Sequence, residues 1–180
     1  MVTPQEKYYK STIVDSIVKD IDYAYKYKIL GGCIILILSA IDAMAALAMP
    51  SEKKDVDRKD FMNWTSKYMK TDPGQKYQYD PIDIYGARCG IVHRYSSNSD
   101  LSDSGSCKIF GYHDGSDHAY NENIDNNLVM ISITRFKEDF KKAVIKFLKD
   151  ALNDCSLKQR IESRLESLFN YTDAPSQLAQ

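Results

Sequence analysis

Two side chains in the middle of the chain, Arg88 and His93, are of the types that phosphodiester chemistry uses. An arginine guanidinium holds a phosphate through a planar fork of N–H donors. An imidazole has an unperturbed pKa of about 6.5, so it takes or gives a proton near neutral pH. The pair lies within residues 85–95, just before a loop rich in Ser and Asp. Because this spacing also arises often by chance, its interpretation depends on the elements that carry the pair.

Three further residues are candidates for supporting roles. Asp42 interrupts an otherwise apolar run, and a carboxylate in such a setting needs a partner that Arg88 can supply. Cys89 follows Arg88 directly, and Arg94 follows His93. Arg94 either contacts a phosphate or is a solvated surface charge. His93 also has a purely structural interpretation, because a histidine at a helix C-terminus interacts favourably with the helix dipole.

Composition limits the classes of protein to consider. The 180 residues fit a single domain with a proper core, and the formal net charge of −1 gives no overall attraction to nucleic acid. The four cysteines are scattered, which indicates reduced thiols in a cytoplasmic protein. The first residues lack the apolar core of a secretory signal peptide. Any surface that binds RNA must therefore be local.

The apolar segment 29–49 has two interpretations. It is long enough for a single membrane span, which needs about 20 apolar residues. Asp42 near the bilayer centre would cost about 2.5–3.5 kcal/mol, and lysines flank both ends. A helix that is apolar all round is also typical of the centre of a helical bundle. We therefore predict a buried core helix and no membrane association, with a single-span protein as the alternative.

Periodicity predicts helices around this central one. The fold class is mainly α: a bundle of about five to six helices with a small inserted β-hairpin. A capping box of Ser156 and Gln159 is predicted to begin the last helix. We predict one domain over residues 1–170, with the hairpin at about 106–134 and a flexible tail at 171–180. The predicted helices cover residues 5–28, 29–49, 57–69, 80–93, 135–153 and 156–169, and the predicted strands cover 108–113 and 128–134.

The spacing of Arg88 and His93 raises a geometric problem. On a regular helix, residues five apart point about 140° from each other, so the two side chains should not converge within a straight helix. Two solutions remain open. Gly90 permits distortion near the end of the helix, or two copies of the chain share one cleft across a twofold axis.

The acidic helix around Asp42, a spacer helix and the run from Asp83 to His93 together resemble the HEPN superfamily. Its members are α-helical bundles with an Arg-x4-6-His motif near the end of a late helix. Many are metal-independent ribonucleases of toxin–antitoxin, phage-defence and RNA-processing systems, whereas others are inactive binding or scaffold modules. The resemblance covers about two thirds of the chain and is strongest over residues 84–93.

The resemblance implies roles for the candidate residues. Arg88 and His93 take the two catalytic motif positions, and Asp42 takes the acidic position of the earlier helix. It further implies a homodimer with both motifs lining one cleft, RNA as substrate, an antitoxin or defence-system protein as partner, and no cofactor or metal. One position departs from the family pattern. The residue after the arginine is usually polar, whereas here it is Cys89. This departure favours the alternative of an inactive module.

Two rival sites remain. A zinc site would use imidazole and thiolate ligands, but no second pair has zinc-finger spacing. Its candidate ligands are Cys89, His93, Cys107, His113 and His118. The lysines on the polar face of the late helix would form an RNA track, or a solvated face interrupted by carboxylates, and we favour the second. They are Lys137, Lys141, Lys142, Lys146 and Lys149.

Overall fold

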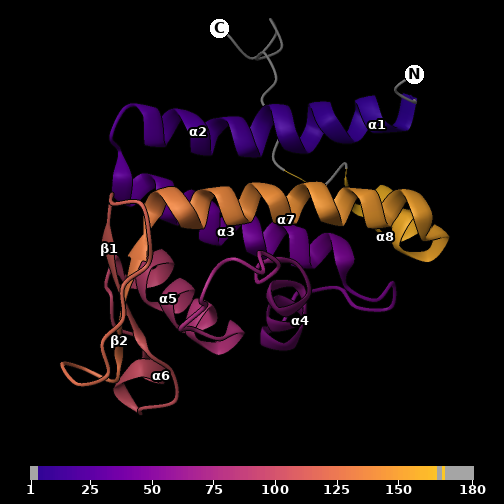
Figure 1. The fold of residues 1–180 in the computed structure, drawn as a ribbon. Coiled ribbons are helices and arrows are strands. Elements are labelled where there is room, and N and C mark those ends of the chain that lie inside the picture. Colours follow the sequence, from indigo (N-terminus) through magenta and orange to yellow (C-terminus); the bar gives the residue numbers. More distant parts are fainter. Residues whose placement is uncertain (1–3, 166–167, 169–180) are drawn as a thin grey trace, which may run out of the picture.

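The computed structural model describes residues 4–165 and residue 168, and over them the chain is mainly α-helical, as the sequence predicts. Figure 1 shows a helical bundle with a small sheet and a short helix at one end. The predicted tail, residues 171–180, lies outside the described residues. The elements in chain order are α1 (Pro4–Tyr9), the π-helical stretch η1 (Lys10–Val18), α2 (Lys19–Lys26), α3 (Leu30–Ala48), α4 (Arg58–Tyr68), α5 (Pro81–Arg94), α6 (Asp100–Asp103), β1 (Ile109–His113), β2 (Leu128–Ser132), α7 (Ile133–Asn153) and α8 (Cys155–Leu165).

The first helix runs without a break through α1, η1 and α2, which confirms the helix predicted over residues 5–28. The chain then reverses at Lys28, whose φ of 59° lies in the left-handed region. Gly31 and Gly32 lie in the first turn of α3, and a Cβ on Gly31 would come within 2.7 Å of the Tyr95 hydroxyl oxygen. Gly31 therefore leaves room for the Tyr95 side chain beside the start of α3.

Helix α3 is the centre of the bundle, where it contacts α2, α4, α5, α7 and α8 (Figure 1). Its buried side chains include Ile37, Leu38, Ile41 and Met44, as expected for a core helix. By length and composition, α3 is also the one helix among the described residues that could cross a membrane, and 50% of its most apolar window is buried in the bundle. A core helix of a soluble protein passes the same test of length and composition.

The two strands form a parallel pair, so the predicted hairpin is wrong. Ile109 pairs with Leu128 and His113 with Ser132, which gives both strands the same direction. The connection between them is long enough to return along the sheet, and Ala119 pairs with Met130 in an antiparallel bridge on the way. An antiparallel hairpin needs only a tight turn, whereas a parallel pair needs a crossover of a dozen or more residues. Residues 114–127 supply that crossover.

The structure differs from the prediction in two further details, an additional short helix and the start of the last helix. The polar segment 96–105 contains the short helix α6, with Ser99 at its N-cap. Helix α8 begins two residues earlier than a Ser156 cap requires, because the Asp154 carboxylate accepts the backbone N–H groups of Ser156 (2.9 Å) and Leu157 (3.0 Å). Aspartate is as good an N-cap as serine, so the upstream residue takes the position.

Candidate active site

The helix that carries the motif, α5, is fixed at its N-terminus by local signals and by one buried carboxylate. Asp80 is the N-cap and Pro81 takes the first helical position, close to the start of the helix predicted over residues 80–93. The Asp83 side chain is buried and accepts hydrogen bonds from the N–H groups of Asp80 and Lys108, each at 2.7 Å. Asp83 therefore ties the start of α5 to the segment that enters β1. The motif helix is thereby held against the sheet.

At its other end, α5 stops directly after the motif. Tyr95 adopts a left-handed conformation with φ 52°, and its N–H donates to the Ile91 carbonyl at 3.0 Å. The chain then turns back over Gly90, where a Cβ would lie 2.7 Å from the backbone oxygens of Ser96 and Asn98. Only glycine allows this approach. His93 therefore lies in the last turn of α5, where its side chain is exposed.

The three residues that the sequence singles out form one connected chain of contacts. The Arg88 Nε atom donates to Asp42 Oδ2 at 2.5 Å, which joins α5 to α3. The Arg88 Nη1 atom lies 2.7 Å from His93 Nε2. The Asp42 and Arg88 side chains are 20% and 21% exposed, so the ion pair lies at the edge of the core. The predicted pairing of Asp42 with Arg88 is confirmed.

The expectation that Arg88 and His93 diverge within one chain is wrong. The angular argument fixes the directions of the two Cα–Cβ bonds, but an arginine side chain is long enough to run around the helix surface. Asp42 holds the guanidinium at the point where its far nitrogen meets the imidazole. Convergence therefore needs neither a distorted helix nor a second copy of the chain.

Burial and the ion pair together shift the pKa values of Asp42 and Arg88. Burial raises the pKa of Asp42, and the hydrogen bond and charge of Arg88 only partly offset this. Burial acts to lower the pKa of Arg88, but Asp42 outweighs it, so the guanidinium pKa lies above its ordinary value. Arginine has no acceptor, so the contact with His93 requires an imidazole whose Nε2 is unprotonated. In this contact the guanidinium donates and His93 Nε2 accepts.

A pocket of about 350 Å³ opens beside His93. Tyr85 and Cys89 line it from α5, and Arg58 lines it from the start of α4. The Arg58 guanidinium lies 5.6 Å from the centre of the Tyr85 ring, a cation–π contact. Burial raises the pKa of the Tyr85 hydroxyl, with a further contribution from the Cys89 thiol, so the phenol stays protonated at neutral pH. The pocket thus combines an aromatic ring with positive charge.

Arg94 and Asp100 form the rim of the same pocket. Arg94 Nη2 lies 2.6 Å from Asp100 Oδ1, and both side chains are more than half exposed. The Asp100 contact raises the pKa of Arg94. Arg94 is thus a solvent-exposed, ion-paired charge beside His93, as the surface-charge interpretation expects, and a phosphate contact stays a prediction.

Sequence reasoning missed five residues of this pocket, which are Arg58, Tyr85, Ser99, Asp100 and Leu101. Tyr85 lies three positions before Arg88 and four before Cys89, a helical spacing that places it on the same face, so its position carried a usable signal. Arg58 comes from a different helix, and no sequence pattern connects it to the motif. Its place beside Tyr85 follows only from the packing of α4 against α5.

The rival zinc ligands do not gather. Cys89 and His93 line the motif pocket, whereas the His113 Nδ1 atom accepts the Gly115 N–H and the His118 Nδ1 atom accepts the Ser132 N–H. Among residues 4–165 and 168, no three His, Cys, Asp or Glu side chains lie together as a metal site would need.

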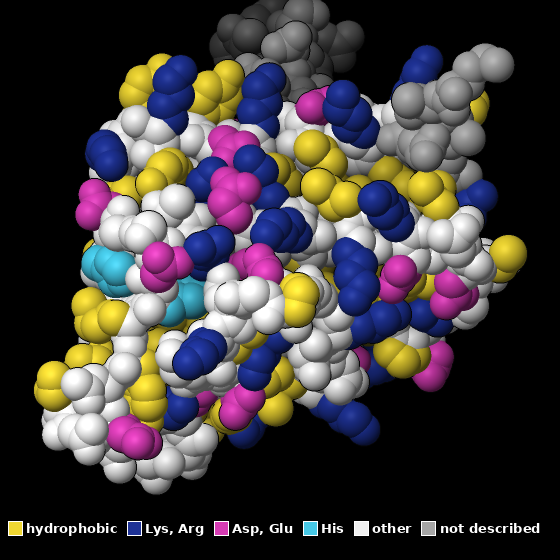
Figure 2. Space-filling view, viewed as in Figure 1, with side chains coloured by type: hydrophobic (Ala, Val, Ile, Leu, Met, Phe, Trp, Pro, Cys, Tyr) yellow, Lys and Arg dark blue, Asp and Glu magenta, His cyan; other side chains and the backbone are white. Residues whose placement is uncertain are grey.

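The lysine face of α7 is less solvated than predicted. Lys137 is buried, and both Lys137 and Lys141 pair with Asp22 of α2, at 2.9 and 3.1 Å. Lys142 pairs with Asp72 at 3.0 Å. The face of the molecule in Figure 2 shows lysines and arginines interspersed with carboxylates. These lysines join elements of the bundle, and the face carries no continuous positive track.

No protein-family model, no curated protein and no solved structure matches the chain.

Proposed function

We propose that the protein is a metal-independent endoribonuclease of the HEPN type, which acts as a toxin or in phage defence. The observation that carries this proposal is the contact chain from Asp42 through Arg88 to His93 at the mouth of a pocket. A base and a charge stabiliser in direct contact are what cleavage of a phosphodiester by a neighbouring hydroxyl requires.

In the proposed reaction, the substrate phosphate takes the Arg88 Nη1 donor that faces His93. The imidazole Nε2 is then free to accept the proton of the ribose 2′-hydroxyl. The 2′-oxygen attacks phosphorus and the bond from phosphorus to the 5′-oxygen breaks. The leaving oxygen takes up a proton from solvent water, and His93 returns the proton that it accepted to solvent. Arg88 stabilises the negative charge that gathers on the phosphate oxygens. The products are a 2′,3′-cyclic phosphate and a 5′-hydroxyl end.

The pocket beside His93 supplies room for the nucleotide next to the cleaved bond. Tyr85 and Arg58 offer an aromatic surface and a cation, which suit base stacking and phosphate contact. Arg94 adds charge at the rim. Because the whole chain carries a net charge of only −1, RNA would be held locally at this pocket.

A second candidate function is an inactive HEPN-like binding or scaffold module. The observation that favours it is Cys89, whose thiol lines the pocket where the family places a polar group. A thiol is a weak hydrogen-bonding group, so it supports a phosphate or water poorly.

In either case we propose a cytoplasmic homodimer whose partner is an antitoxin or another defence-system protein. The single-span membrane alternative rests on α3 alone, and recovery of the protein only with detergent would favour it.

The test is cleavage of total RNA by purified protein, with and without a chelator. Wild-type protein should cleave in both, and the new ends should be 2′,3′-cyclic phosphates. His93→Ala should lose activity at least about a hundredfold, the lower range for loss of a general base. Its fold should persist, because His93 is exposed. The matched control is His113→Gln, a histidine of β1 outside the pocket, purified in the same way.

The outcomes separate the two functions. Equal cleavage by wild type and His93→Ala would identify a contaminating nuclease and refute the catalytic proposal. A folded wild-type protein that cleaves no RNA at any pH from about 5 to 8, the range over which histidine titrates, would favour the binding module.

A further inference from the structure

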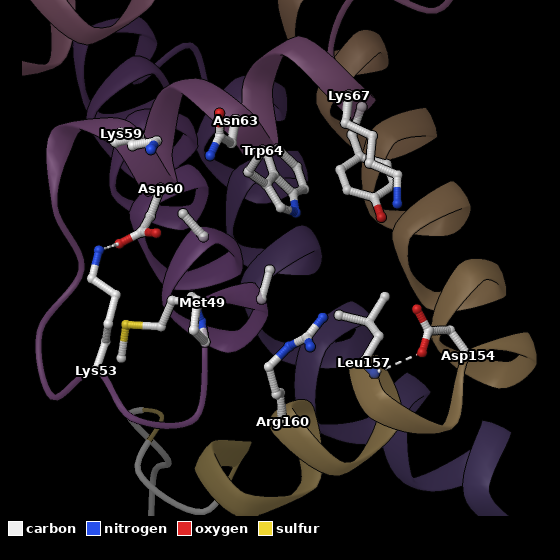
Figure 3. Close-up of a pocket in the computed structure, with 14 residues that line it drawn as sticks. Met49, Lys53, Lys59, Asp60, Asn63, Trp64, Lys67, Asp154, Leu157 and Arg160 are labelled. Carbon is white, nitrogen blue, oxygen red and sulfur yellow. Dashed lines mark hydrogen bonds and ion pairs between the residues drawn. The ribbon is translucent and has the colours of Figure 1, made fainter.

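A second cavity lies away from the motif, where the end of α3, helix α4 and the start of α8 meet (Figure 3). Its volume is about 470 Å³, within the range of small-molecule sites. Ala45, Ala48, Met49 and Leu157 form apolar parts of its wall. It shares no lining residue with the pocket beside His93. Its polar groups decide which ligand it would recognise.

Trp64 presents a buried donor to this cavity. The side chain is only 2% exposed, and it is packed against Tyr68 and Phe147 of the core. Its indole Nε1–H has no hydrogen-bond partner among the described residues. In Figure 3 the indole nitrogen points from α4 toward the cavity. Buried indole N–H groups normally find an acceptor, so this donor indicates that an acceptor belongs in the cavity.

Arg160 faces Trp64 from the opposite side, where α8 directs its guanidinium into the same space (Figure 3). Its Nη1 atom donates to the Ser156 hydroxyl at 2.9 Å, which orients the group. Its Nε–H is buried and, within the described part of the chain, also lacks a partner. Two unpartnered donors, one of them cationic, therefore converge on one cavity.

The charges of the residues that line the cavity indicate the charge of its ligand. Four cations and two carboxylates line the cavity, an excess of two positive charges (4 − 2 = +2); they are Lys53, Lys59, Lys67, Arg160, Asp60 and Asp154. Both carboxylates already have partners. Asp60 pairs with Lys53, and Asp154 caps α8. Lys53 also pairs with Asp57, and Lys67 pairs with Asp150 at 3.3 Å. The cations left for a ligand are therefore Lys59 and Arg160, together with the Trp64 donor.

We propose that this cavity binds the phosphate group of a small phosphate monoester, or free phosphate itself. A dianionic phosphate matches the two cations without a carboxylate partner, Lys59 and Arg160, and offers acceptor oxygens to Trp64 and Arg160. The alanines, Met49 and Leu157 form a wall on which the remainder of an ester can lie. This site is separate from the proposed nuclease centre, and it stands whether or not the protein cleaves RNA.

Trp64 is the only tryptophan of the chain, so its fluorescence reports on the cavity directly. The wild-type protein is titrated with inorganic phosphate, glycerol 3-phosphate and AMP, and with glycerol and adenosine as neutral counterparts. The phosphate compounds should change the emission saturably at millimolar concentration or below, whereas glycerol and adenosine should not. Tighter binding of the esters than of inorganic phosphate would assign the site to an ester, and equal binding would assign it to free phosphate.

Variants test the two donors by titration calorimetry. Arg160→Gln and Trp64→Phe should each weaken phosphate binding by about tenfold or more, the loss expected for one charge-assisted hydrogen bond. Lys54→Gln makes the same change of charge as Arg160→Gln at an exposed position outside the cavity, and it should bind as wild type does. Circular dichroism confirms that each variant is folded. Absence of saturable binding by all three phosphate compounds, or unchanged affinity in both donor variants, would overturn the proposal.

Discussion

Replacing Arg88 with alanine should destabilise the fold, because it leaves the Asp42 carboxylate at the edge of the core without its partner. The two side chains are 21% and 20% exposed, and Arg88 Nε lies 2.5 Å from Asp42 Oδ2. Breaking a fully buried ion pair costs about 3–5 kcal/mol. Since a fifth of each side chain stays in solvent, we expect a loss of about 2–3 kcal/mol, which lowers Tm by about 4–12 °C in a domain of this size.

The loss should depend on pH in a defined direction. Burial already raises the pKa of Asp42 in the folded protein, and Arg88 opposes that rise. Without Arg88, the pKa of Asp42 should rise further. A carboxyl whose folded pKa lies above its unfolded value weakens the fold at high pH, and this penalty disappears as the pH falls through the folded pKa. The difference in unfolding free energy between wild type and Arg88→Ala should therefore be smaller at about pH 5 than at about pH 7.

The assay is urea denaturation followed by circular dichroism at both pH values. Two controls locate the effect in the ion pair. Arg88→Lys keeps the charge and should retain most of the stability. The double variant Arg88→Ala, Asp42→Asn removes the stranded carboxylate and should recover part of the loss, with a coupling of about 1–3 kcal/mol. A loss below about 0.5 kcal/mol, typical of a surface substitution, or a loss that is equal at both pH values, would refute this reasoning.

The remaining predictions concern the end of the motif helix, the start of α4 and the assembly. Helix propensity alone would make Gly90→Ala stabilising, but its Cβ would lie 2.7 Å from two backbone oxygens, so thermal unfolding should show a loss of about 1–3 kcal/mol. A hydrogen bond from Lys53 lowers the pKa of Asp57 from 3.8 to about 2, so this carboxylate stabilises the fold above its unfolded pKa. That contribution should be lost as the pH falls toward 2, and Asp57→Asn should show a shallower decline of stability in acid. Light scattering should give twice the chain mass of 20.6 kDa if the proposed homodimer forms, and a mass of one chain would exclude it.

The sequence predicted elements whose signals are local. Asp80 and Pro81 mark the start of α5, and the apolar stripe of α7 includes Phe140 and Phe147, both buried. These features depend on neighbours within one or two turns, so the chain itself displays them. The strand pair was misjudged because strand direction depends on how the connection returns. Ala119 pairs with Met130 partway along that connection, and no local pattern shows this bridge.

In the candidate site, too, some contacts could be predicted from the sequence and others could not. The pairing of Asp42 with Arg88 could be predicted, because an isolated carboxylate in an apolar helix needs a cation. The contact of Arg88 with His93 could not, because helical angles describe backbone directions and the long arginine side chain departs from them. Arg58 joins the pocket only through the packing of α4 on α5. Contacts made by long side chains, and contacts between different helices, therefore cannot be predicted from sequence patterns.

The contacts of Arg88 make a structural role and a catalytic role compatible in one residue. A guanidinium carries five N–H donors, and here the Nε–H bonds Asp42 while one Nη1–H faces His93. When the substrate phosphate takes the Nη1 donor that faces His93, four N–H donors are available to it, enough for a forked contact. Asp42 would thus act as a positioning residue, which holds the guanidinium by one edge and leaves the other edge for substrate. A purely structural ion pair has no need of His93 at 2.7 Å from the same guanidinium, and that contact is why we favour the nuclease over the scaffold.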